Sequence, residues 1–106
     1  RVLYPFGAGD HVDHLQVKAG VEAIRVHYPQ CQFVPFYDQP YTHRHIDRYA
    51  DELQRAYAYH PNATAMDAKL TACLAYRTQV GFQFGNEEAM KRFLGTTEYF
   101  TQPPRG

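Results

Sequence analysis

Two short apolar runs with a helical pattern between them dominate the first third of this chain. Residues 1–6 and 32–37 are short and apolar, which predicts β-strands. Between them, residues 11–27 repeat apolar side chains at the spacing of a helix that packs on a sheet. A strand–helix–strand order is typical of neighbouring parallel strands. The pattern therefore predicts an α/β fold with a parallel pair.

The rest of the chain reads as helical. Residues 43–58 form an amphipathic pattern, and Asp67 is the predicted cap of a helix over 68–80. Asn86 is the predicted cap of a short final helix that ends at Gly95. Two strands make a poor sheet for 106 residues, so we expect one end of a larger α/β domain. Such a part is expected to expose apolar surface or to cover it with another chain.

Composition excludes several classes of function. The 11 Lys and Arg residues balance the 11 Asp and Glu residues, unlike the basic surfaces that bind nucleic acid or anionic membranes. No apolar stretch approaches the roughly 20 residues of a membrane helix, and the N-terminus lacks the pattern of a signal peptide. Cys31 and Cys73 have no partner at a zinc-motif spacing. We expect two reduced thiols and a cytoplasmic setting, with one disulfide between them as the alternative.

Residues 10–14, Asp-His-Val-Asp-His, carry most of the potential chemistry. With Asp10 as the predicted N-cap, His11 and His14 lie three residues apart and project to one side of the helix. A helix N-terminus disfavours the imidazolium form, as a metal ligand requires. Asp13 can hydrogen-bond an imidazole or polarise a water. A solvated helix start remains the alternative, since a catalytic zinc takes three protein ligands and this segment offers one or two.

Residues 9–17 resemble the second signature of the LmbE-like (PIG-L) family of zinc-dependent N-deacetylases. Further stretches resemble family segments in the same order, and together they span nearly all of the chain: residues 36–41, 69–79 and 98–100. The resemblance implies the C-terminal part of a Rossmann-like parallel-sheet domain with a helical C-terminal half. Residues 1–106 are accordingly expected to be a single domain or half-domain of such an enzyme.

The resemblance also implies a role for each residue of the motif. His14 would be a zinc ligand, and His11 would act as general acid or stabilise the tetrahedral oxyanion. Asp13 would hydrogen-bond a histidine and tune it. The implied reaction is hydrolysis of an N-acetyl group on a glucosamine-type amino sugar by a zinc-activated water. The family's first signature, Ala-His-Pro-Asp-Asp, is absent. The nearest string, residues 59–63, has Asn62 where an Asp is needed and is interpreted as a helix stop and turn.

We therefore expect enzymatic activity only with an upstream His-Pro-Asp-Asp half, supplied by a missing segment or a second chain. Assembly as a homo-oligomer is expected on the same ground. The alternative is a non-catalytic carbohydrate-binding or scaffold remnant that has lost the first zinc motif. Tyr37, Asp38 and Tyr41 could line a sugar pocket or serve as turn and core residues. The substrate-binding residues are otherwise unassigned.

Overall fold

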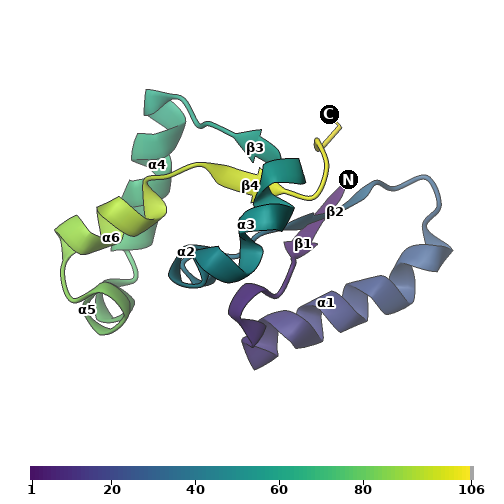
Figure 1. Ribbon diagram of the computed structural model, residues 1–106, viewed down its shortest axis with the longest axis horizontal. Helices are drawn as coiled ribbons and strands as arrows, with labels where there is room; N and C mark the ends of the chain where they lie inside the picture. Colours follow the sequence, from purple (N-terminus) through teal and green to yellow (C-terminus); the bar gives the residue numbers. More distant parts are fainter. Residues whose placement is uncertain (106) are drawn as a thin grey trace. The chain divides into compact units, whose positions relative to one another are not determined.

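The computed structural model describes residues 1–105 and divides the chain into two compact units (Figure 1). Among the described residues, the sheet unit combines residues 1–59 with residues 98–105. The helical unit is the intervening segment, His60–Thr97. The residues of the predicted site all lie in the sheet unit.

The sheet unit contains a four-stranded mixed sheet in the order β1-β2-β4-β3. Its strands are β1 (Val2–Pro5), β2 (Phe33–Phe36), β3 (Tyr57–Tyr59) and β4 (Glu98–Phe100). β1 and β2 run parallel, in a register that pairs Leu3 with Val34, whereas the β2–β4 and β3–β4 pairs are antiparallel. The predicted α/β class and the parallel pair are confirmed, and the expected number of two strands is wrong.

Strand β3 was missed because the predicted helix over 43–58 ends early. Two helices, α2 (Tyr41–Arg44) and α3 (Ile46–Arg55), replace the single helix predicted over 43–58. The Tyr-Ala-Tyr segment that follows is extended, because it pairs with the distant residues of β4. Nothing local distinguishes that segment from another helical turn, so only the pairing reveals β3.

Aromatic residues form the core of the sheet unit, where the ends of β1 and β2 meet α3. Phe6 stacks on Tyr37 with 4.6 Å between ring centroids, and it meets the edge of Tyr49 at 6.2 Å. Tyr37 and Tyr49 are buried, as are Tyr4 and Val34 in the two parallel strands. This cluster includes Phe6, which lies directly before the turn that carries the two site histidines.

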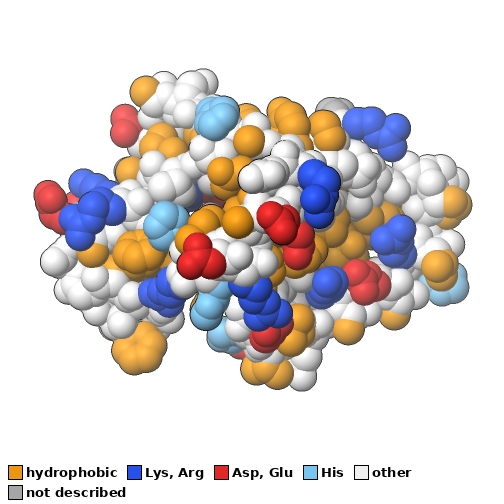
Figure 2. Space-filling view, viewed as in Figure 1, with side chains coloured by type: hydrophobic (Ala, Val, Ile, Leu, Met, Phe, Trp, Pro, Cys, Tyr) orange, Lys and Arg blue, Asp and Glu red, His pale blue; other side chains and the backbone are white. Residues whose placement is uncertain are grey.

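Helix α1 (Val12–Ile24), continued by a 3₁₀ turn, η2 (Arg25–His27), connects β1 to β2. The apolar face of α1 was expected to pack firmly on the sheet, but none of its residues is buried. Val12 is 61 % exposed, and Val26 in η2 is 72 % exposed. Figure 2 shows apolar side chains at the surface along this helix. Apolar surface is therefore exposed on α1, beside the edge strand β1. It was expected at one edge of the sheet, and its cover by another chain stays a prediction.

The helical unit contains three helices: α4 (Ala63–Leu74), α5 (Arg77–Phe84) and α6 (Glu87–Leu94). Asn62, not Asp67, caps α4, because its side-chain oxygen accepts the Ala65 N–H at 2.8 Å. The helix predicted over 68–80 is interrupted at Tyr76, whose backbone leaves the helical region. The predicted cap of α6 by Asn86 is confirmed by its bond to the Ala89 N–H.

Cys31 and Cys73 are both free thiols. Each helix found within residues 1–105 falls short of the length and apolar character that crossing a membrane requires.

Candidate functional site

The site is built on the turn between β1 and α1. This turn includes the short 3₁₀ segment η1 (Ala8–Asp10). Gly7 has φ +89°, and a Cβ there would lie 2.7 Å from a methyl carbon of Leu15. Glycine therefore meets both a conformational and a steric requirement at this position. The turn places the two histidines beyond the carboxyl end of β1, where open α/β sheets bind ligands.

The residue that caps α1 is His11, so the prediction of Asp10 as the cap is wrong. His11 has extended backbone angles, and its Nδ1 accepts the Asp13 N–H at 3.2 Å. Asp10 has φ +60°, and its carboxylate faces away, where it accepts two bonds from the Arg48 guanidinium at 2.6 and 3.2 Å. This guanidinium holds the pKa of Asp10 below its usual range.

His14 is held by a buried carboxylate from the segment that follows β2. Its Nδ1 lies 2.8 Å from Oδ2 of Asp38, a residue only 2 % exposed. The same carboxylate accepts the Gly7 N–H at 3.0 Å. Because an ionised carboxylate only accepts, the proton of a neutral His14 ring resides on Nδ1. The Nε2 lone pair is then left for a ligand, which is how a carboxylate prepares a metal-binding histidine.

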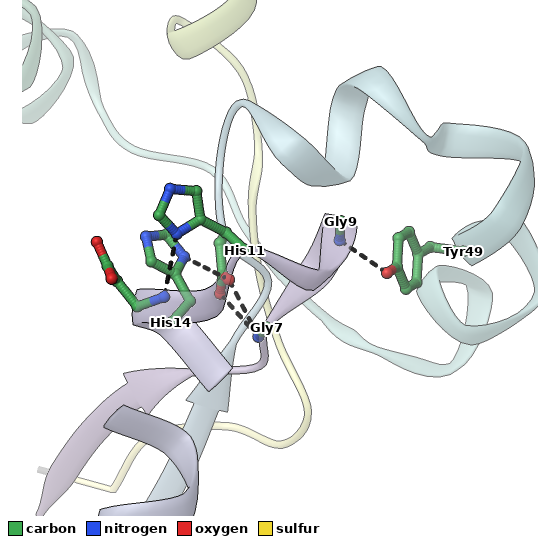
Figure 3. Close-up of polar contacts among 7 residues, drawn as sticks. Gly7, Gly9, His11, His14 and Tyr49 are labelled. Carbon is green, nitrogen blue, oxygen red and sulfur yellow. Dashed lines mark hydrogen bonds and ion pairs between the residues drawn. The ribbon is translucent and has the colours of Figure 1, made fainter. Parts of the chain in front are cut away.

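His11 has the opposite arrangement. Its Nδ1 is the acceptor for a backbone N–H, so the proton of its neutral ring resides on Nε2. Figure 3 shows the two rings close together, with 4.9 Å between their centroids. One ring therefore presents a lone pair and its neighbour a hydrogen-bond donor.

Tyr41 at the start of α2 forms an aromatic wall beside the pair. Its ring centroid lies 5.4 Å from that of His11 and 5.4 Å from that of His14. Tyr37 instead belongs to the core, where its hydroxyl lies 3.5 Å from a Glu52 oxygen. Burial, followed by the Glu52 carboxylate, raises the pKa of the Tyr37 phenol. Of the three residues considered for a sugar pocket, only Tyr41 borders both histidines.

Sequence reasoning did not identify Asp38 as the partner of His14. The carboxylate considered for that purpose was Asp13, whose side chain is exposed and whose backbone N–H contacts His11. A signal was available: Asp38 follows β2 as His14 follows β1, and parallel strands end at the same edge of a sheet. The tuning role expected of Asp13 stays a prediction.

The donor set was tested against a zinc site. Within residues 1–105, no group of three or more His, Cys, Asp or Glu side chains is placed to hold a metal ion. His14, with Asp38 behind it, fits one position of such a site. The described residues do not complete the three protein ligands that a catalytic zinc takes.

Comparison of the chain with protein-family models, curated proteins and solved structures finds no match. A function for the chain is therefore inferred from its residues and their geometry.

Proposed function

We propose that this chain supplies a zinc-binding histidine and a hydrogen-bond-donating histidine to an N-deacetylase that acts on N-acetylated amino sugars. The proposal rests on one observation: in two adjacent histidine rings, Nδ1 has opposite hydrogen-bonding partners, an acceptor in one and a donor in the other. His14 Nδ1 faces the Asp38 carboxylate, and His11 Nδ1 faces a backbone N–H. The resemblance of residues 9–17 to a deacetylase signature assigns the same division of roles.

In this proposal His14 is the ligand. The Asp38 carboxylate fixes the ring orientation and increases the basicity of Nε2. Asp38 is itself held by the Gly7 N–H, so the ligand is connected to the turn that ends β1. Zinc bound here would supply a Lewis acid and lower the pKa of a coordinated water.

His11 is the electrophilic partner in the proposed reaction. A neutral ring with its proton on Nε2 can donate to the oxygen that becomes negative when water attacks an amide carbonyl. His11 keeps this proton, because a neutral imidazole that lost it would become an imidazolate; the proton that the departing amine needs would come from the attacking water. Tyr41 borders both rings and offers an aromatic surface against which a sugar face could pack.

The remaining ligands are proposed to come from polypeptide outside residues 1–105, such as a His-Pro-Asp-Asp half or a second chain. The exposed apolar residues of α1 and the edge position of β1 support a further element there. In the same proposal, the parallel β1–β2 pair is one end of a Rossmann-like sheet.

The test uses the protein that carries these residues together with a His-Pro-Asp-Asp half. Zinc content is measured by plasma emission, and acetate release is measured from an N-acetylglucosaminide. His14→Ala is expected to lose tightly bound zinc. His11→Ala is expected to retain zinc and to lose about 100- to 1,000-fold in kcat, the usual effect of removing an oxyanion donor. His27→Ala, at an exposed position of η2, is the matched control.

Equal zinc content in the wild type and His14→Ala would contradict the ligand assignment. Full turnover by His11→Ala would contradict the catalytic one. A wild type that neither binds zinc nor releases acetate would refute the proposal and favour a non-catalytic carbohydrate-binding or scaffold role.

A further inference from the structure

The turn that leads into His11 has an unusual backbone. Gly7, Gly9 and Asp10 all have positive φ, at +89°, +76° and +60°. Asp10 is the residue directly before His11 and the only one of the three with a side chain. An L-residue adopts this left-handed conformation rarely, so external contacts are needed to hold it.

Two consecutive residues of α3 provide such contacts. The hydroxyl of Tyr49 accepts the Gly9 N–H at 2.9 Å, as Figure 3 shows. The guanidinium of Arg48 donates two hydrogen bonds to the Asp10 carboxylate, at 2.6 and 3.2 Å. The Arg48 guanidinium also lies 5.1 Å from the centre of the Tyr49 ring. The two side chains therefore act on adjacent residues of the turn.

The two contacts differ in setting. Tyr49 is 3 % exposed and packs edge-on against Phe6, so its hydroxyl is held by the core. The Arg48–Asp10 pair is on the surface, where each side chain is more than half exposed. On the other side of the turn, a Cβ at Gly9 would come within 2.9 Å of Tyr41. The turn thus contacts residues of both α3 and α2.

We propose that Arg48 and Tyr49 are positioning residues for His11. They hold the turn in the conformation that places the His11 Nδ1 on the Asp13 N–H and thereby leaves the Nε2 proton free to donate. His14 is expected to change less than His11, because its Nδ1 bonds to Asp38, whereas Arg48 and Tyr49 bond to Asp10 and Gly9. The inference rests on the proposed function, in which the Nε2 proton of His11 is the catalytic group.

The test measures the tautomers of both rings by ¹⁵N NMR of the 106-residue chain. Spectra are recorded at about pH 8.5, above the ordinary histidine pKa of about 6.5, so that the rings are neutral. In the wild type, His11 is expected to carry its proton on Nε2 and His14 on Nδ1. Tyr49→Phe removes only a hydroxyl and is expected to lower the Nε2–H to Nδ1–H ratio of His11 about fivefold.

Arg48→Gln should lower the same ratio about twofold, because surface ion pairs are weaker. Arg48→Lys should restore part of the wild-type ratio, because lysine keeps the positive charge but cannot form the bidentate contact with Asp10. Tyr28→Phe and Arg25→Gln are matched controls at exposed positions outside the turn. All spectra are taken well below the unfolding transition, so that only the folded protein is observed.

A structural role without positioning would lower the melting temperature of the variants and leave the His11 ratio at its wild-type value. That result overturns this inference and leaves the proposed function intact. A wild type without opposite tautomers in the two rings overturns the proposed function and this inference together. A change in the His11 ratio that exceeds any change in the His14 ratio supports both.

Discussion

Replacing Asp38 with asparagine tests the hydrogen bonds that connect the end of β2 to the start of α1. The buried Asp38 carboxylate accepts the Gly7 N–H with both oxygens, at 3.0 and 3.3 Å, and contacts His14 Nδ1 at 2.8 Å. Asparagine keeps the shape but replaces one acceptor oxygen with an NH₂ donor. In either orientation of the amide, that NH₂ stands within 3.3 Å of the Gly7 nitrogen, donor against donor.

The magnitude follows from the change in bond type. A hydrogen bond to a charged group contributes about 1.5–3 kcal/mol, and a neutral one contributes about 1 kcal/mol. Weakening two charged bonds at Asp38 should therefore lower the free energy of unfolding by about 1–4 kcal/mol. In a zinc-loaded protein, the same loss of the carboxylate behind His14 should lower zinc affinity by about 10- to 100-fold.

The assay is urea unfolding followed by the amide NMR signals of β1 and β2, which report on the sheet unit. With an m-value of about 2 kcal/mol per molar for a small protein, a loss of ~2 kcal/mol lowers the midpoint by about 1 M. Asp51→Asn is the matched control, because Asp51 is exposed on α3. Its stability should change by no more than about 0.5 kcal/mol. Equal midpoints for Asp38→Asn and Asp51→Asn would refute the reasoning.

Two further predictions concern Tyr37 and Asn86. Burial and the Glu52 carboxylate raise the pKa of the Tyr37 phenol above its ordinary value of 10.0. The neutral phenol therefore contributes fully to the free energy of unfolding below about pH 10, and this contribution is lost as the pH rises through the folded-state pKa. In an alkaline absorbance titration, Tyr37→Phe should remove a phenol that ionises at higher pH than the others. Glu52→Gln should make the Tyr37 phenol ionise at a lower pH than in the wild type. A titration curve unchanged in both variants would contradict this prediction. Asn86→Ala should destabilise the helical unit by about 1 kcal/mol through loss of the α6 cap, and Asn86→Ser should restore most of it in thermal unfolding.

Whether a feature could be predicted from the sequence depends on how far apart in the chain the interacting residues lie. The cap of α6 by Asn86 could be predicted because donor and acceptor lie three residues apart. Asp67 was predicted to cap this helix, and Asn62 was interpreted as part of a turn, but Asn62 caps α4. Both are good capping residues, and where the helix starts decides which of them acts as the cap. Local chemistry thus identified capping residues and left helix boundaries open.

The same contrast applies to the site. The proximity of His11 and His14 follows from their separation in the sequence, because the N-cap residue of a helix and the third residue of its first turn lie close together. Their opposite tautomers were not, because one of the deciding partners is remote. Asp38 lies on a different strand end, and it reaches His14 only when β1 and β2 pair in parallel.

By itself, the sequence determined the strand–helix–strand order, the parallel β1–β2 pair and the position of the histidine pair at the start of α1. These features depend on hydrophobic periodicity and on short-range geometry. Only the tertiary structure decided the pairing of β3 with β4 and the attachment of Arg48 to Asp10. Each of these contacts joins segments far apart in the chain, and many residues could have satisfied the same donors and acceptors. Which residue does so is settled by the packing that brings the segments together.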